Sequence, residues 1–356
     1  MEKVVRFLQK EIDKDVTPGA VIRVRHRGRI VLDEALGYNC LEPGKTNMSS
    51  RHVFDMASLT KVMVTLPAML QLFASGALYL HDKVSTFLPG FGSNGKDQIT
   101  VKQLLTHSSG LVAHRPYFES RMGKEEVLAS IHQETLAYQP DSAVVYSDLG
   151  FIILMELIEQ LTGQRIDEFA KEHIFQPLSI KDTGYLPVFQ HDRYAPTEFA
   201  AHLEGHKYGV VHDDNTEYMG GVSGHAGLFS TMDDVAVFTQ MLENNGEYEG
   251  KRIIDRHWLE LSRQNFTPFS NESRGIGWQL KGNDASPAGD LMSAGAYGHT
   301  GFTGTSFYID PERELTVMLL TNRVYFGRHS HMIRLRPRLH NLIVTQLPEE
   351  EENACG

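Results

Sequence analysis

The stretch FDMASLTK, residues 54–61, runs directly into a series of apolar residues at helical spacing. These residues repeat every three or four positions: Met56, Leu59, Met63, Leu66, Leu70 and Phe73. The repeat predicts an amphipathic helix, with Ser58 and Lys61 on one of its faces. A serine becomes nucleophilic beside a base, and a partly buried lysine at a helix N-terminus loses its proton more readily than in water. Ser58 and Lys61 are therefore a candidate nucleophile and base.

A Ser-x-x-Lys pattern alone is a weak signal, because about one such tetrapeptide is expected by chance in a chain of 356 residues. Ser93 and Lys96 form a second copy, in a Gly-rich loop without an apolar helix behind it. We interpret that copy as a chance match. For Ser58 the alternative is a helix N-cap serine followed by a surface lysine, and the tetrapeptide by itself does not decide between the two.

The flanking segments predict a sheet built from both ends of the chain. Residues 20–26 alternate apolar and polar, Gly28 marks a turn, and residues 29–37 continue as the second strand of a hairpin. Strand-like runs return at 277–280, 305–309 and 315–320, and a closing helix follows at about 332–347. The middle is mostly helical from 57 to 163 and mixed from 164 to 221.

This order predicts an α+β fold. We expect a sheet domain of residues 1–56 plus 222–356, and an inserted, mostly helical domain of residues 57–221. The acidic tail, residues 348–356, is expected to be disordered.

Two further segments place polar groups where chemistry is possible. Tyr146-Ser147-Asp148 lies between a Pro-containing loop and an apolar helix, so a short loop presents a phenol and a carboxylate. The segment GHTGFTGT, residues 298–305, is Gly-rich and precedes a strand, so its main-chain N–H groups can approach an oxyanion closely. Taken alone, it favours the simpler interpretation of a tight turn. Tyr308-Ile309-Asp310 falls within a predicted strand and is interpreted as structural.

The order of these elements resembles the serine β-lactamase and penicillin-binding protein superfamily: a Ser-x-x-Lys helix, a Tyr-x-Asn-like loop and a Lys/His-Thr-Gly strand. The resemblance is strongest to the branch of class C β-lactamases, D-alanyl-D-alanine carboxypeptidases and serine esterases. It extends over nearly the whole chain through FDMASLTK (54–61), LLTHSSGL (104–111), GGVSGHAGLFS (220–230) and LTNR (320–323). The resemblance implies an antiparallel sheet flanked by helices.

The resemblance also implies roles for individual residues. Ser58 would be the acyl-accepting nucleophile, and Lys61 and Tyr146 would relay protons to and from it. The resemblance does not decide which of the two takes the first proton. The backbone N–H groups of Ser58 and Phe302 would form the oxyanion hole. Substrate contacts would come from four further residues: Asp148, His299, Thr300 and Gly301.

The implied function is a serine acyl hydrolase that forms a covalent acyl-enzyme on D-alanyl peptides, β-lactams or small esters. It needs no cofactor. The alternative is a module that binds penicillin or cell-wall fragments without turnover. We favour the enzyme because all the reacting groups are present.

Two positions depart from the superfamily pattern. Asp148 stands where relatives that hydrolyse β-lactams usually have Asn, so an N–H donor is replaced by an acceptor. We expect Asp148 to face Lys61, to favour its ammonium form and to shift the base role toward Tyr146. His299 stands where many relatives have Lys, and an ordinary histidine is mostly neutral at pH 7. We expect weaker selection for substrate carboxylates, with binding of anions strengthening as the pH falls.

Composition limits the partners. The formal net charge of −11 disfavours nucleic acid, so a small molecule or short peptide is the expected partner, and the oligomeric state stays open. His202 and His206 lack the adjacent Glu of zinc peptidases, so no metal is expected. With two cysteines, Cys40 and Cys355, the chain has no disulfide framework. No signal peptide or membrane span is seen, which predicts a cytoplasmic protein, or an extracytoplasmic one if a leader has been removed.

Overall fold

The computed structural model describes residues 1–42, 44–282 and 285–348. Within these ranges seven strands form one antiparallel sheet in the order β11-β12-β13-β14-β1-β2-β3. Their bounds are β1 Gly19–His26, β2 Arg29–Cys40, β3 Thr46–Asn47, β11 Gln279–Leu280, β12 Tyr297–Thr300, β13 Ser306–Asp310 and β14 Leu315–Thr321. The first hairpin pairs with β14, so the two ends of the chain share the sheet and the α+β prediction is confirmed.

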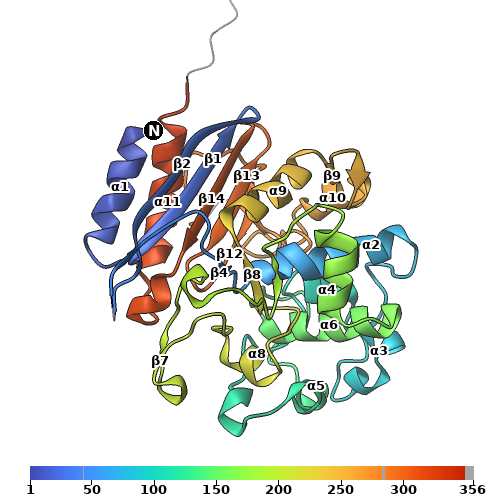
Figure 1. Ribbon diagram of the computed structural model, residues 1–356. Coiled ribbons are helices and arrows are strands. Elements are labelled where there is room, and N and C mark those ends of the chain that lie inside the picture. Colours follow the sequence, from blue (N-terminus) through green and yellow to red (C-terminus); the bar gives the residue numbers. More distant parts are fainter. Residues whose placement is uncertain (43, 283–284, 349–356) are drawn as a thin grey trace, which may run out of the picture.

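Both faces of the sheet are covered by helices. Helices α1 (Glu2–Ile12) and α11 (His331–Val344) pack side by side on one face, and α9 (Met232–Glu243) lies on the other (Figure 1). The first face buries apolar residues of both helices, among them Leu8 and Leu339. Because both faces are covered, every residue of β14 is buried, as its continuous apolar run requires.

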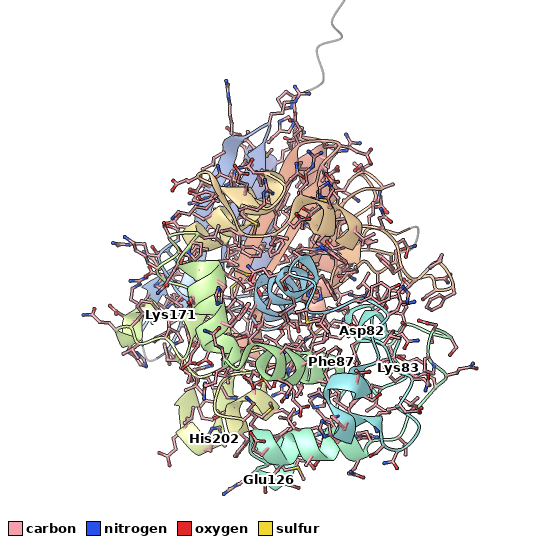
Figure 2. All side chains as sticks on the ribbon, turned by 90° about the vertical axis from the view of Figure 1, so that its right-hand side faces the viewer. Asp82, Lys83, Phe87, Glu126, Lys171 and His202 are labelled. Atoms are coloured by element: carbon pink, nitrogen blue, oxygen red, sulfur yellow. The ribbon has the colours of Figure 1, made fainter. Side chains whose placement is uncertain are left out.

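The remaining helices gather beside the end of the sheet, in the region that Figure 2 shows with Phe87 and Glu126 labelled. They are α2 Leu66–Ala74, α3 Val84–Phe87, α4 Val101–Leu105, α5 Lys124–Gln133, α6 Asp148–Thr162, α7 Ile166–Ala170, α8 Asp214–Tyr218 and α10 Arg256–Ser262. Short sheets accompany them. One has three strands in the order β4-β8-β5 (β4 Phe54–Asp55, β8 Leu228–Ser230, β5 Gly184–Tyr185), and two are strand pairs, β6 Phe199–Ala200 with β7 Gly205–His206 and β9 Glu247–Tyr248 with β10 Lys251–Arg252.

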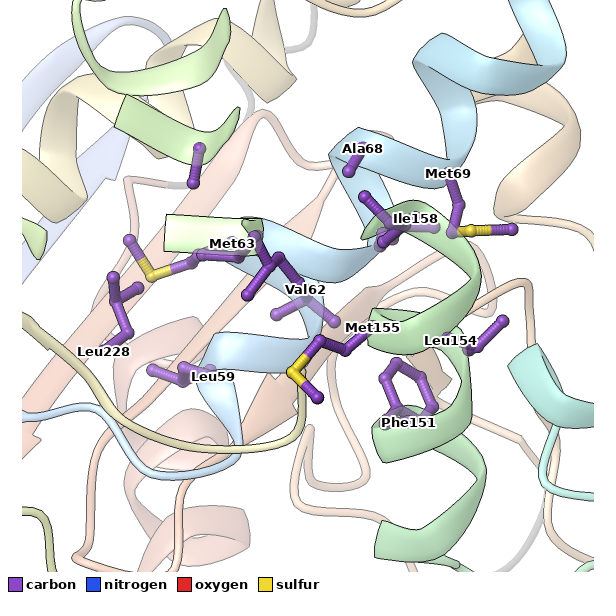
Figure 3. Packing of buried hydrophobic residues seen from close by; sticks show 14 of the residues in the cluster. Leu59, Val62, Met63, Ala68, Met69, Phe151, Leu154, Met155, Ile158 and Leu228 are labelled. Carbon is purple, nitrogen blue, oxygen red and sulfur yellow. The ribbon is translucent and has the colours of Figure 1, made fainter. Parts of the chain in front are cut away.

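One hydrophobic cluster joins the sheet to the helices. It contains Val21 of β1 and Met318 of β14 together with Leu59 and the apolar face of α6. Figure 3 shows Leu59, Val62 and Met63 on one side and Phe151 and Met155 of α6 on the other. Since the core runs through both regions, the two-domain division at residues 56/57 and 221/222 stays a prediction.

The predicted helix after Ser58 differs in detail. Residues 57–58 form a turn, residues 59–60 are helical, Lys61–Thr65 is a π-helical turn (η1), and the helix α2 begins at Leu66. Rare π-helical turns occur frequently at functional sites. The expected disorder of the tail falls on residues that, apart from Pro348, lie outside the described ranges. Within those ranges no helix has the length and apolar character needed to span a membrane.

Candidate active site

Ser58 lies in a tight turn that is stabilised by hydrogen bonds from neighbouring residues. The preceding residue, Ala57, has a φ of 46°, a left-handed conformation that is unusual for a residue with a Cβ. Its N–H donates to Asp55 Oδ1 at 2.7 Å, and its carbonyl accepts from Thr60 Oγ1 at 2.6 Å. The carboxylate of Asp55 also accepts from the His212 N–H at 2.6 Å. Local strain is therefore balanced by buried hydrogen bonds, as is common around a reactive side chain.

Lys61 is fully buried beside Ser58. Its Nζ donates to Ser58 Oγ at 3.0 Å, to Asp148 Oδ1 at 2.8 Å and to the His225 carbonyl at 3.1 Å. An ammonium group has three N–H bonds, so all its donors are used. Burial alone would lower the pKa of Lys61, but Asp148 and Tyr146 together more than reverse this and raise it. Lys61 is thus held as an ammonium ion.

Asp148 begins helix α6 and faces Lys61, as the sequence predicts. Its other oxygen, Oδ2, lies 3.8 Å from Nδ1 of His114, a half-exposed side chain that the sequence did not single out. Burial would raise the pKa of Asp148, yet Lys61 and His114 hold it well below the usual range. The same pairing raises the pKa of His114. Asp148 is therefore a carboxylate shared between two positively charged or chargeable groups.

Tyr146 is packed against the same lysine. Lys61 Nζ lies 4.8 Å from the centroid of the Tyr146 ring. The phenol hydroxyl is buried without a well-aligned hydrogen bond, although Lys61 and Ser58 lie close enough to act on its charge. Burial raises the pKa of Tyr146, and the Lys61 ammonium opposes that rise. The loop is fixed behind the ring, because the Ser147 N–H donates to His107 Nδ1 at 3.0 Å.

The turn between β12 and β13 lies against the Ser58 segment. Thr303 Oγ1 donates to the Asp55 carbonyl at 2.7 Å, and Thr305 Oγ1 donates to the Met56 carbonyl at 3.2 Å. Gly301 is required for this approach, since a Cβ there would lie 2.6 Å from Met56 O. The Gly-rich segment is therefore both a strand end, at Thr300, and a tight turn.

Two backbone N–H groups stay free where these segments meet. Within the described ranges, neither the Ser58 N–H nor the Phe302 N–H donates to a protein acceptor. Arg323 Nε donates to the Phe302 carbonyl at 2.7 Å and its guanidinium lies over the Phe302 ring, which fixes the orientation of that peptide. Arg323 therefore holds the Phe302 peptide in place. Two free donors beside a serine hydroxyl can bind an oxyanion.

His299 lies in β12 and is almost completely buried. Its Nδ1 contacts the Thr300 carbonyl at 2.9 Å, so Nδ1 carries the proton and Nε2 is an acceptor. Burial, followed by the charge of Arg274, lowers the pKa of His299 well below its ordinary value. The lowered pKa disfavours protonation of His299, so this side chain gives no support to the expected strengthening of anion binding at falling pH.

A cavity of about 300 Å³ opens above these groups. Its lining combines the reacting groups with acidic and imidazole side chains: Ala57, Ser58, His114, Phe118, Tyr146, Asp148, His212, Asp213, Asp214, His225, Ala226, Phe302 and Arg328. Arg328, the one arginine in this lining, already pairs with Glu198 and Asp214, each at 2.8 Å. The cavity wall thus carries three carboxylates, and each also contacts a basic side chain: Asp148 with Lys61, Asp213 with His225 and Asp214 with Arg328.

Other sequence candidates have structural roles. The Lys96 amine donates to the carbonyls of Ser93, His132 and Glu134. His225 contacts Ser223 Oγ at 2.8 Å and Asp213 Oδ1 at 3.1 Å, which organises the Gly-rich loop around it.

Tyr308 and Asp310 lie in strand β13, as expected. The Cys40 thiol is buried and donates to the Glu42 carbonyl, whereas Cys355 lies outside the described residues. Within the described ranges no group of three or more His, Cys, Asp or Glu side chains is arranged to hold a metal ion, at His202 and His206 or elsewhere.

The chain matches the Beta-lactamase family over residues 4–339. It belongs to this family. The "N-acetylmuramyl-L-alanine amidase" of Bacillus subtilis (strain 168) is 34% identical over 362 residues, covering 90% of this chain and 81% of the relative. A relative from Escherichia coli (strain K12), named as a candidate D-alanyl-D-alanine carboxypeptidase, is 34% identical over 305 residues, covering 76% of this chain and 69% of the relative.

A solved structure described as "EstCE1, a hydrolase with promiscuous acyltransferase activity" superposes with a TM-score of 0.75 at 22% identity, covering 94% of this chain and 97% of that one. At this identity it supports the fold alone. Family membership makes the chain a serine acyl hydrolase of the β-lactamase and penicillin-binding protein type.

Proposed function

We propose that the protein transfers an acyl group from an amide substrate to Ser58 Oγ and then to water. The observation that carries this proposal is the 3.0 Å contact between Ser58 Oγ and Lys61 Nζ, next to the free N–H groups of Ser58 and Phe302. In the tetrahedral intermediate these N–H groups donate to the oxyanion. Such donors lower the barrier by about 3–4 kcal/mol each.

Tyr146 is the general base in this scheme. Lys61 is an ammonium whose three donors are engaged, so it has no lone pair with which to accept the Ser58 proton. The reactive form has an ionised Tyr146 beside the Lys61 ammonium, and the phenolate takes the proton as Ser58 Oγ attacks the carbonyl carbon.

Tyr146 then gives this proton to the departing nitrogen as the C–N bond breaks. A water molecule then hydrolyses the acyl-enzyme in the same two steps. Its proton goes to Tyr146 as its oxygen bonds the acyl carbon, and Tyr146 returns that proton to Ser58 Oγ as the ester bond breaks.

For the substrate, we propose the amide bond between an N-acetylmuramyl group and the L-alanine of a peptide. A terminal D-alanyl-D-alanine substrate presents a carboxylate, but the cavity offers it no unpaired arginine and the buried His299 is neutral. Cleavage of either amide releases an α-ammonium group, which suits a wall that includes Asp148, Asp213 and Asp214. In the muramyl peptide, however, the carboxyl group of the L-alanine is part of the next peptide bond, so no carboxylate lies beside the amide that is cleaved. The name of the Bacillus subtilis relative supports the same substrate class.

The test compares two amides. The protein is incubated with N-acetylmuramyl-L-alanyl-D-isoglutamine and with a peptide ending in D-alanyl-D-alanine, and the products are identified by liquid chromatography and mass spectrometry. Ser58→Ala is the inactive control, and Ser93→Ala is the matched control in the other Ser-x-x-Lys segment.

We expect free N-acetylmuramic acid and the L-alanyl dipeptide, formed by the wild type and Ser93→Ala but not by Ser58→Ala. Release of D-alanine alone would replace the proposed substrate by a carboxypeptidase substrate. A penicillin adduct on Ser58 without turnover of either amide would favour the binding module.

A further inference from the structure

A buried arginine lies against the ring of Tyr146. Arg274 is 4% exposed, and its Cζ lies 5.3 Å from the centroid of the Tyr146 ring. Nη2 pairs with Glu272, whereas Nε and Nη1 are buried and have no partner among the described residues. The Glu272 side chain is 41% exposed, so water screens its charge. Arg274 therefore leaves largely uncompensated positive charge beside the ring.

The backbone holds Arg274 in place. Its N–H donates to Thr267 Oγ1 at 2.9 Å, and its carbonyl accepts from the Phe266 N–H at 2.8 Å. Arg274 also bridges to Gln279, the first residue of β11, which pairs with Gly298 next to His299. A residue anchored at these points keeps its position relative to the sheet edge.

The two histidines packed around Tyr146 add no charge. The ring centroid of His107 lies 4.5 Å from that of Tyr146, and that of His299 lies 5.8 Å away. Burial, and next to it Arg274, lowers the pKa of both imidazoles well below the ordinary value. His107 Nδ1 accepts from the Ser147 N–H, so the neutral ring carries its proton on Nε2.

The charged groups that act on the Tyr146 hydroxyl are thus few. Lys61 contacts the ring and favours ionisation, and Asp148 opposes it. These two charges form an ion pair with each other at 2.8 Å, so Asp148 offsets part of the effect of Lys61 on Tyr146. The second cation on the ring, Arg274, has no such partner in the site.

We propose that Arg274 is a positioning residue that stabilises the negative charge on Tyr146 Oη when Tyr146 takes the proton of Ser58. This inference rests on the proposed role of Tyr146 as the base. A cation against an aromatic ring, or close to a phenolate in a site with little water, favours the anion. Arg274 does not line the cavity, so it acts through Tyr146 and not on the substrate.

The test is the pH dependence of kcat/KM with p-nitrophenyl acetate, a neutral activated ester. In Arg274→Met the loss of positive charge raises the pKa of Tyr146. The rising limb of the profile then moves to higher pH, and the rate at neutral pH falls about tenfold. Arg274→Lys keeps the charge, so its limb should lie between those of Arg274→Met and the wild type.

A second variant reverses the sign. Glu272→Gln removes the carboxylate that partly neutralises Arg274, so the limb should move to lower pH. Glutamine keeps an oxygen acceptor for Arg274 Nη2, and the side chain of residue 272 is partly exposed. This variant therefore perturbs the fold less than Arg274→Met does, which keeps the test available if Arg274→Met does not fold. Arg263→Met is the matched control: Arg263 lies 5.0 Å over the ring of Tyr297, outside the site, and its removal should leave the profile unchanged.

Three results would overturn the inference. Arg274→Met with an unshifted profile and reduced folded protein would make Arg274 structural. A raised KM for carboxylate substrates at unchanged kcat would make it a substrate ligand. A Glu272→Gln profile that does not move would show that the charge of Arg274 is not felt at Tyr146. Failure of the proposed base itself is recognised separately, since Tyr146→Phe would then keep the wild-type rate.

Discussion

The protein contains the same tetrapeptide pattern twice, with opposite outcomes. Lys61 and Lys96 each follow a serine by three residues, and both side chains are completely buried. Lys61 donates to the Ser58 hydroxyl and to the carboxylate of Asp148. Lys96 donates to three main-chain carbonyls, one of them that of Ser93 itself.

The partners reverse the electrostatics of the two amines. The pKa of Lys61 is raised because Asp148 and Tyr146 together outweigh burial. Burial lowers the pKa of Lys96, and Glu134 only partly opposes this. One lysine is therefore a charged group directed at a hydroxyl, and the other ties a loop to its neighbours. The two segments share the Ser-x-x-Lys pattern, but the groups that pack against each lysine differ and determine whether it is catalytic or structural.

The largest expected difference is between the two serines. Ser58→Ala removes the nucleophile, and the loss in kcat/KM should be on the order of 10⁶-fold, as for other serine hydrolases. Ser93→Ala should keep wild-type activity, because Lys96 donates to the main-chain carbonyl of Ser93, which the substitution leaves in place. Steady-state rates with an activated ester, together with mass spectra of the acyl-enzyme, measure both. Equal losses of kcat/KM in the two variants would show that Ser58 and Ser93 do not differ in catalytic role.

The two lysines should separate activity from stability. Lys61→Met should lower the rate by at least about 10³-fold, since a base partner typically contributes 10²–10⁴-fold. Lys96→Met leaves buried carbonyls unpaired, at a cost of about 1–3 kcal/mol for each unsatisfied group, while activity per folded molecule is kept. Urea unfolding combined with active-site titration distinguishes these effects. An inactive but fully folded Lys96→Met would contradict the assignment.

The carboxylates provide a subtler test. Asp148 raises the pKa of both Lys61 and Tyr146, so Asp148→Asn lowers both. The rising limb of kcat/KM should therefore move to lower pH whichever group is the base. Penicillin acylation should also increase, because the amide supplies an N–H donor. An unchanged limb together with unchanged acylation would show that Asp148 does not tune the site.

Glu134→Gln is the matched change beside Lys96, and its effect should be the smallest. Glu134 pairs with Arg115 at 2.8 Å, and the Arg115 side chain is half exposed. The expected cost is about 0.2–1 kcal/mol in the free energy of unfolding. The pH profile should stay unchanged, as a comparison with Asp148→Asn on the same ester would establish. A shifted profile would mean that charge near Lys96 reaches the active site.

Much of the architecture could be predicted from local pattern. The alternation in residues 20–26 and 29–37 gave the β1–β2 hairpin, and the apolar run 315–320 gave β14, because strand periodicity is a property of neighbouring residues. The details around Ser58 were not predictable in this way. Its π-helical turn and the left-handed Ala57 depend on Asp55 and His212, the second of which lies 157 residues from Asp55.

The residues that the sequence did not single out were missed for one physical reason: their roles depend on contacts between distant segments. His114 and Arg274 belong to no motif, and their roles come from contacts with Asp148 and Tyr146 across the fold. His299 was singled out and expected to be mostly neutral at pH 7, but the further lowering of its pKa by burial and Arg274 could not be seen in the sequence. A pKa depends on solvent and neighbouring charge, and both are set by tertiary packing.

The sequence by itself determined the α+β class, the order of the motifs and the identity of Ser58, Lys61, Tyr146 and the Gly301–Phe302 turn as candidates. Those signals are local in residue type and spacing. Only the tertiary structure decided which of two Ser-x-x-Lys segments meets a carboxylate, which N–H groups stay free and which ionisable groups are charged. These properties arise when segments from the two ends and the middle of the chain pack together, since hydrogen bonds and electrostatic fields act through space.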